Sequence, residues 1–183
     1  MAFPTSPVDG QRYQDYTYSL TTGAWEKTPK GTILTFFKQI DTGIRNITAV
    51  YSTFADSLTW NEMTCAGLSR LEILLKVNGR NDEASSWGGI FTKLLYRIDT
   101  GSGYGSYTDL GHSGYDLSMV TGGSSIESRV HPLTMDMSAY DRPFKIQFKT
   151  QHAVYTSGTT ARINDTTSDT NFKSSLRITE IAV

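Results

Sequence analysis

Leu71-Glu72-Ile73-Leu74-Leu75-Lys76-Val77 is the stretch that decides the fold of this 183-residue chain. Positions 71, 73, 75 and 77 are apolar, and the charged Glu72 and Lys76 lie between them. Because successive side chains of a strand point to opposite faces of a sheet, a period of two predicts a half-buried antiparallel strand. The same alternation recurs at residues 94–98 and 144–148.

Turn-forming residues separate these segments, in clusters at residues 78–82, 99–103, 121–125, 157–158 and 164–166. Gly, Asn, Asp and Ser are the residues that tight turns favour. Helical periodicity is nearly absent, and Pro143 limits residues 138–141 to a single turn. Many short strands with turns between them predict an all-β fold, an antiparallel β-sandwich of the jelly-roll kind or a barrel.

The chain divides into two parts of different composition. Thr28-Pro29-Lys30-Gly31 lacks apolar periodicity and predicts a hinge. The residues after it, 31–183, are enough for one globular domain. We therefore expect an N-terminal arm at residues 1–30 and a β-sandwich head domain at residues 31–183.

Aromatic residues, prolines and a turn glycine dominate the arm. A segment this short cannot enclose a core, so its rings can be ordered only by lying on another surface. We predict an extended attachment arm whose contacts come from Phe3, Pro4, Pro7, Gly10, Tyr13, Tyr18 and Trp25.

The first and last strands of the head are apolar on both faces. Residues 32–37 form an apolar run, and the last strand has Leu176 and Ile178 on one face. Its other face carries Thr179, Ile181 and Val183. A single sandwich covers only one face of a strand, so subunit association at these three residues is the simplest cover. The alternative is that the arm folds back over them.

Both parts also resemble a known class of protein. The pattern Pro4, Pro7, Gly10-Gln11-Arg12-Tyr13, then Tyr18 before Gly23-Ala24-Trp25, resembles the N-terminal attachment segment of bacteriophage fibre-like virion proteins. Residues 31–183 resemble a phage C-terminal jelly-roll domain of the tumour-necrosis-factor/C1q-like type. The resemblance rests on Gly31-Thr32-Ile33-Leu34, on residues 91–99, on 155–158 and 162–164, and on the ending Ser175-Leu176-Arg177-Ile178-Thr179-Glu180-Ile181-Ala182. It does not extend to residues 104–131.

This resemblance implies a homotrimer whose C-terminal strands run near the threefold axis, and an arm that binds other virion proteins. Two functions remain open within that class. A tail fibre or receptor-binding tip would carry the head to the host surface, whereas a capsid decoration protein would sit on the shell. The arm favours a fibre, and the lack of a shaft favours decoration.

Composition excludes several other classes. The net charge of −1 gives no basic footprint for nucleic acid. No apolar run approaches the length of a membrane span, and residues 1–4 lack the features of a secretion signal. We expect a virion protein made in the host cytoplasm, without nucleic-acid binding or membrane insertion.

Candidate catalytic and metal-binding residues lack the patterns that chemistry requires. Ser113 in Gly111-His112-Ser113-Gly114 is not followed by the helix of a nucleophile elbow. The three histidines, His112, His131 and His152, have no metal-ligand spacing, and Cys65 is expected to be buried. We predict no enzyme activity, no metal and no cofactor.

Acidic pairs are the remaining candidates for catalysis, because a glycan-cleaving virion protein would need two facing carboxylates. Asp165 with Asp169, and Asp136 with Asp141, lie in loop or turn segments where acidic residues usually cap turns. No repeat of the long β-helical depolymerases is present. A glycan-binding or glycan-cleaving virion protein remains the alternative function.

A loop rich in tyrosine, glycine and serine contains Tyr104, Tyr107 and Tyr115. Tyrosine provides rigid contact area at low entropic cost, and Ser and Gly adapt around it. This composition fits a surface that binds a host glycan or protein, and it fits a contact with a neighbouring subunit equally well.

Overall fold

The structure is a computed structural model that describes residues 3–50, 52–81, 89–110, 118–120, 126–155, 160–164 and 173–183. Every described strand pair is antiparallel, apart from one isolated parallel bridge between Val50 and Val154. The predicted all-β fold with antiparallel sheets is therefore confirmed.

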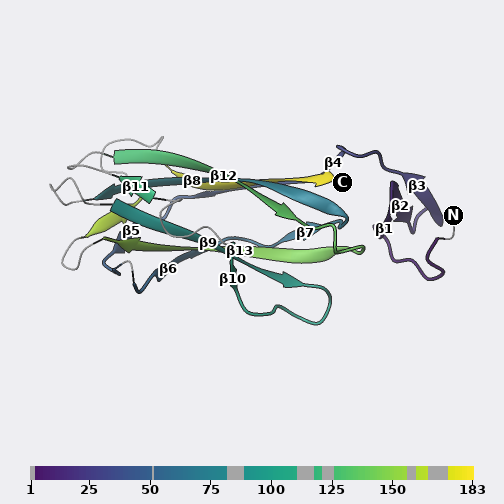
Figure 1. Cartoon of the computed structure of the whole chain (residues 1–183), viewed down its shortest axis with the longest axis horizontal. Coiled ribbons are helices and arrows are strands. Elements are labelled where there is room, and N and C mark those ends of the chain that lie inside the picture. The colour runs from purple at the N-terminus through teal and green to yellow at the C-terminus, as the bar shows by residue number, and fades with distance from the viewer. Residues whose placement is uncertain are drawn as a thin grey trace.

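Two sheets pack face to face along the long axis of the molecule (Figure 1). The β8 sheet consists of β4 (Ile33–Asp41), β5 (Arg45–Ile47), β8 (Ser69–Asn81), β12 (Ile126–Asp136), β14 (Ala161–Ile163) and β15 (Ser174–Ala182). The β13 sheet consists of β6 (Ala55–Thr59), β7 (Met63–Cys65), β9 (Gly89–Asp99), β10 (Thr108–Asp109), β11 (Ser118–Val120) and β13 (Phe144–Val154). The arrangement is a β-sandwich.

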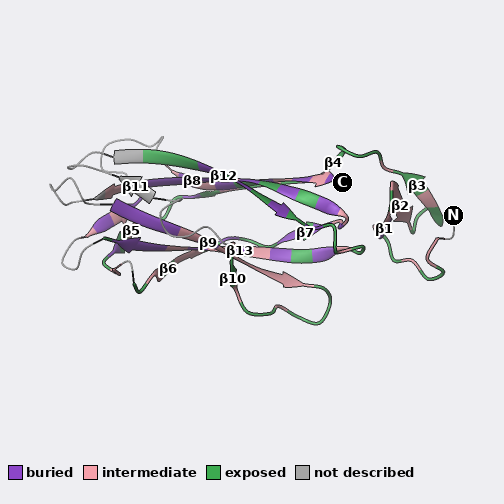
Figure 2. Cartoon of the chain, in the orientation of Figure 1, coloured by how far each residue is buried: buried purple, intermediate pink, exposed green. Residues whose placement is uncertain are grey.

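The core lies between the two sheets and follows the alternation of the sequence. Leu71, Ile73 and Leu75 of β8 are at most 1% exposed, and they face Ile146 and Phe148 of β13. Buried and exposed positions alternate along the same ribbons in Figure 2. The period of two therefore reflects one face on a core and one in water, as predicted.

The N-terminal segment differs from the extended arm that was predicted. It forms a three-stranded meander of β1 (Arg12–Tyr13), β2 (Tyr16–Ser19) and β3 (Ala24–Lys27), called here the N-terminal sheet. Its rings pack on one another: Tyr18 is the direct partner of Trp25, and Phe3 stacks on Trp25 with ring centroids 5.1 Å apart. The rings of this segment therefore pack on one another, whereas the sequence predicted that they would be ordered only by lying on another surface.

The N-terminal sheet lies at one end of the sandwich, beside the end of β15 (Figure 1). The segment after β3 returns to the head directly, because Gly31 N donates to Ala182 O at 2.9 Å and Ala182 N donates to Thr32 O at 2.9 Å. One end of the molecule therefore carries the N-terminal sheet, and the opposite end of the sandwich lies far from it.

Candidate interaction surfaces

The N-terminal sheet presents an aromatic face. Tyr13, Tyr16, Tyr18 and Trp25 lie on one side of it, because Tyr13 pairs with Tyr16 and Tyr18 pairs with Trp25. Phe3 covers this side, 5.3 Å from Tyr16 and 5.8 Å from Tyr13 between ring centroids. All five rings remain half-buried. The face therefore keeps aromatic area available to another molecule.

The other predicted attachment residues, Pro4, Pro7 and Gly10, lie in the segment that leads into the N-terminal sheet. Pro4 and Pro7 are half-buried, and Gly10 has φ of +72°, which favours glycine. A Cβ at Gly10 would lie 3.1 Å from Cγ of Pro143, so the turn also lies close against the head.

Arg12 points away from the aromatic face and into the head. Its side chain is 0% exposed, and Nη1 donates to Leu68 O at 2.8 Å and to Gly67 O at 3.4 Å. Arg12 N also donates to Asp141 O at 2.8 Å. Burial lowers the pKa of Arg12, and the nearby Glu180 and Asp15 oppose that shift. Sequence reasoning missed Arg12, since a lone arginine among aromatic residues gives no signal of burial.

The outer face of the β8 sheet carries the three residues predicted to contact another subunit. Thr179, Ile181 and Val183 are half-buried there, on the side of β15 opposite the buried Leu176 and Ile178. Thr179 lies between Phe36 of β4 and Glu72 of β8, and Ile181 lies between Ile33 and Arg70.

Large apolar side chains are exposed on the same face. Phe36 is 58% exposed, Ile33 64%, Ile40 52% and Val130 56%. The N-terminal segment leaves this surface open, so the alternative in which the arm folds back over it is wrong. Subunit contact at this face stays a prediction.

A hollow of about 420 Å³ lies in the middle of that outer face. Its lining includes Leu74, Pro132, Thr134 and Thr179, with Glu72 and Arg177 adding opposite charges. Arg177 is the direct cross-strand partner of Lys38, and neither forms an ion pair with a described residue. Like charges directly opposite each other destabilise a sheet, so the Arg177–Lys38 pair is an unfavourable feature at the edge of this hollow.

The predicted tyrosine loop lies on the outer face of the β13 sheet. The Arg97 guanidinium lies 4.5 Å from the ring centroid of Tyr104 and 4.7 Å from that of Tyr107. The Tyr104 hydroxyl donates to Glu62 Oε2 at 2.8 Å, and the Tyr107 hydroxyl donates to Gln147 Oε1 at 3.1 Å. Both rings are thus engaged within the chain, and Tyr115 lies outside the described residues.

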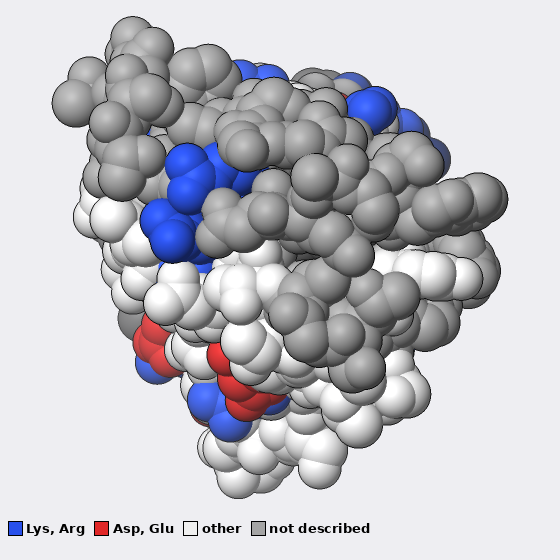
Figure 3. Space-filling view, turned by 90° about the vertical axis from the view of Figure 1, so that its left-hand side faces the viewer, with Lys and Arg blue, Asp and Glu red and all other residues white. Residues whose placement is uncertain are grey.

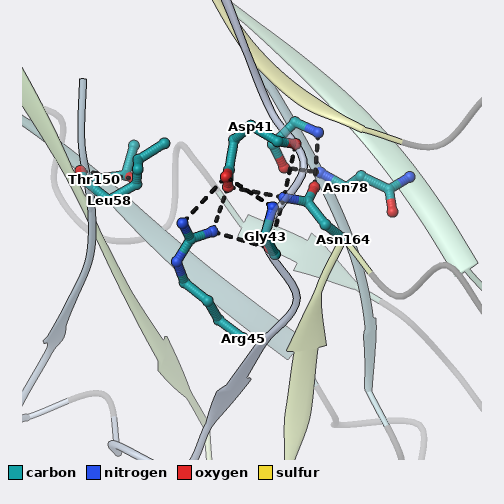
Figure 4. Close-up of polar contacts among 8 residues, drawn as sticks. Asp41, Gly43, Arg45, Leu58, Asn78, Thr150 and Asn164 are labelled. Atoms are coloured by element: carbon teal, nitrogen blue, oxygen red, sulfur yellow. Dashed lines mark hydrogen bonds and ion pairs between the residues drawn. The ribbon is translucent and has the colours of Figure 1, made fainter. Parts of the chain in front are cut away.

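A buried polar network joins the ends of four strands (Figure 4). Asn164, with φ of +57°, donates from Nδ2 to Asp41 Oδ2 at 2.8 Å and to Asp41 O at 3.0 Å. Arg45 forms a salt bridge with Asp41, and Ser174 N donates to Asn164 Oδ1 at 2.7 Å. Because its carboxylate, guanidinium and amide bond one another, the network stabilises chain crossings and provides no free reactive group.

The residues tested for chemistry are accounted for structurally where the structure describes them. Asp136 caps a turn through Ser138 N at 2.9 Å, and Asp141 accepts from Gln11 Nε2 at 3.4 Å. Burial raises the pKa of the Cys65 thiol, which keeps it protonated. Ser113, His112, Asp165 and Asp169 lie outside the described residues.

Within the described ranges, no three His, Cys, Asp or Glu side chains form a group that could hold a metal ion. That part of the chain also has no helix long and apolar enough to cross a membrane.

His152 predicts a pH dependence of stability. Burial lowers its pKa from 6.5 to about 3, and its Nδ1 lies 2.9 Å from Thr92 Oγ1. The unfolded chain therefore binds a proton that the folded chain excludes, so stability is full above pH 6.5 and falls toward pH 3. We expect the free energy of unfolding to fall by about 1.4 kcal/mol per pH unit below the unfolded pKa.

Urea unfolding at pH 7.0 and pH 5.0 measures this effect before carboxylates protonate. In His152→Gln the difference between the two pH values should shrink, because the titrating ring is gone. A variant with the same pH dependence as the unmodified protein would show that another group is responsible.

The end of the sandwich opposite the N-terminal sheet is seen in Figure 3, where lysine and arginine side chains reach the surface beside atoms that are not described. Arg80 of β8 and Arg162 of β14 are direct cross-strand partners near this end. Aspartate or glutamate side chains also reach the surface in the same view.

No protein-family model matches the sequence, and no curated protein matches it. The solved structures to which the chain is similar include three from infectious bursal disease virus. The Gt strain structure is 9% identical, with 99% of this chain and 44% of that chain covered at a TM-score of 0.47. The VP2 subviral particle is 11% identical, with 99% and 46% covered at 0.46. The virus-derived T=1 particle is 6% identical, with 90% and 40% covered at 0.47. The chain spans less than half the length of these three proteins.

Proposed function

We propose that this chain is a non-enzymatic structural protein of a bacteriophage virion, attached to the particle by its N-terminal sheet and displayed as a homotrimer. The observation that carries the proposal is the aromatic face of that sheet. Its five half-buried rings lie at one end of the molecule, and the buried Arg12 fixes the sheet to the head. Such a surface can bind a partner without first ordering a flexible arm.

Self-association is proposed at the outer face of β4 and β15. Phe36, Ile33 and Ile40 expose more than half of their surface there, beside Thr179 and Ile181. Burying this apolar area between copies would stabilise the assembly and remove exposed apolar surface from solvent. Three heads on one particle would also strengthen weak contacts, since later contacts become effectively intramolecular.

Two positions on the particle fit this proposal, as capsid decoration or as a tail-fibre tip that contacts host glycan or protein. Labelling purified virions with gold-conjugated antibody to residues 31–183 separates them. Gold over the head would favour decoration and direct attention to shell stability. Gold at the tail would favour a fibre and direct attention to receptors.

Deletion of residues 1–27 tests the attachment role. We expect the shortened protein to be absent from purified particles, and because the deletion also removes the buried Arg12, its folding has to be checked by circular dichroism first. A finer test replaces both Phe3 and Trp25 by alanine, which removes two stacked rings and retains Arg12. The matched control is Leu20→Ala, at a 67% exposed position of the same segment. Normal incorporation of the double variant would reject the aromatic face as the attachment site.

A further inference from the structure

The turn at residues 66–68 has its amide groups directed at a buried carboxylate. Ala66 N donates to Glu180 Oε1 at 2.8 Å and to Oε2 at 3.0 Å, and Gly67 N donates to Oε1 at 3.2 Å. The Ser69 hydroxyl adds a bond to Oε1 at 2.8 Å. Glu180 lies on the core side of β15 and is 0% exposed. The turn therefore holds a charged group that belongs to the last strand.

The carbonyl groups of the same turn are directed at the buried guanidinium of Arg12. Gly67 O and Leu68 O both accept from Arg12 Nη1, and Leu68 O also accepts from Val183 N at 3.2 Å. Peptide groups that donate to an anion and accept from a cation are polarised by both, so each charge strengthens the bonds of the other. The turn connects the first strand of the chain to the last.

This turn has little freedom to adapt to the loss of either charge. Gly67 has φ of +84°, and a Cβ there would lie 2.4 Å from Tyr140 O. Leu68 also has positive φ, at +43°, and its amide donates to Tyr140 O. Packing holds the backbone of this turn in a rare conformation. A displacement of its amide groups, which bind Glu180, therefore also displaces its carbonyl groups, which bind Arg12.

Arg12 and Glu180 are both fully buried, and an isolated charge in a protein interior costs free energy. Two nitrogens of Arg12, Nε and Nη2, have no hydrogen-bond partner among the described residues. Removing one member of a buried charge pair leaves the other uncompensated, which destabilises much more than the pair contributes. Of the two carboxylates that raise the pKa of Arg12, Glu180 has the larger effect and Asp15 the smaller, although Arg12 and Glu180 bond to opposite sides of the turn.

We propose that Arg12, the turn at residues 66–68 and Glu180 act as one cooperative latch, so that docking of the N-terminal sheet and the position of the β15 end depend on each other. Thr179 and Ile181, the sequence neighbours of Glu180, lie on the outer face of β15, whereas Glu180 faces the core. If those residues contact another subunit, as the proposed function holds, the latch couples subunit contact to presentation of the aromatic face. Arg12 is then a positioning residue for that face.

Hydrogen exchange on the full-length protein tests the latch without any particle. The reporters are the amides of Arg12, which donates to Asp141 O, and of Val183, which donates to Leu68 O. In Glu180→Gln we expect exchange at Arg12 to accelerate by at least about tenfold, since a lost charge-assisted contact changes local opening by that order. In Arg12→Met we expect the reciprocal acceleration at Val183, and Arg12→Lys should retain part of the protection.

Asp136→Asn is the matched control, because this exposed carboxylate lies on the same sheet but outside the latch. It should leave both reporters unchanged. If Glu180→Gln fails to fold, Ser69→Ala removes a single donor to Glu180 and gives the same readout more mildly. Unchanged exchange at Arg12 in Glu180→Gln, unchanged exchange at Val183 in Arg12→Met, or additive effects in the double variant would overturn the proposal. These results do not depend on particle attachment, which the deletion of residues 1–27 tests separately.

Discussion

Gly67→Ala is expected to lower the free energy of unfolding by about 3 kcal/mol, through backbone strain together with overpacking. The residue has φ of +84°, and an added Cβ would lie 2.4 Å from Tyr140 O and 2.9 Å from Arg142 O. Both neighbours are backbone atoms, so neither can move aside as a flexible side chain would. Urea unfolding followed by tryptophan fluorescence measures the change.

Gly31→Ala is the control for this prediction. Gly31 has nearly the same φ, +82°, and nothing lies within 4 Å of a Cβ built there. It should therefore show the cost of the backbone conformation alone, about 1 kcal/mol. Equal losses at the two glycines would mean that the close approach to Tyr140 and Arg142 contributes nothing.

Ile181→Asp is expected to convert the assembled protein to monomers. Ile181 lies on the outer face of β15 between Ile33 and Arg70, at the centre of the proposed subunit contact. A carboxylate buried there would lose its hydration and the apolar contact with Ile33, and its cross-strand neighbour Arg70 is already paired with Glu72; three copies multiply the penalty. Light scattering coupled to size-exclusion chromatography gives the mass directly.

Leu95→Asp provides the matched control, because Leu95 is also half-buried but lies on β9 of the other sheet, opposite Asp109. It should leave the mass unchanged. A trimeric Ile181→Asp protein would move the subunit contact away from β15, and a monomeric unmodified protein would refute self-association altogether.

The alternation of apolar residues was enough to predict half-buried antiparallel strands, which a sandwich or a barrel would both contain. Leu71, Ile73 and Leu75 all face the core, and so do Ile146 and Phe148 on the facing sheet. Burial of one face is a local property of each strand, which is why a short window of sequence reveals it. Which strands become neighbours was not predictable, because pairing depends on contacts between distant segments.

The contacts of Glu180 and Arg12 could be predicted from the sequence only in part. The same alternation that places Leu176 and Ile178 inward also places Glu180 inward, so a buried carboxylate could have been expected. Its donors could not, since they come from a turn more than a hundred residues earlier in the chain. Arg12 was missed for a related reason, because its partners are backbone carbonyls and these have no residue signature.

The position of β15 has a consequence for how the protein is made. This strand lies between β4 and β8 and pairs with both of them. During synthesis the two neighbours leave the ribosome long before it does, and each then has an unpaired edge next to its apolar residues. Native closure has to wait for β15, and this long-range pairing favours slow folding. Unpaired edges of this kind are sites of aggregation, so nascent chains should need protection until residues 174–182 emerge.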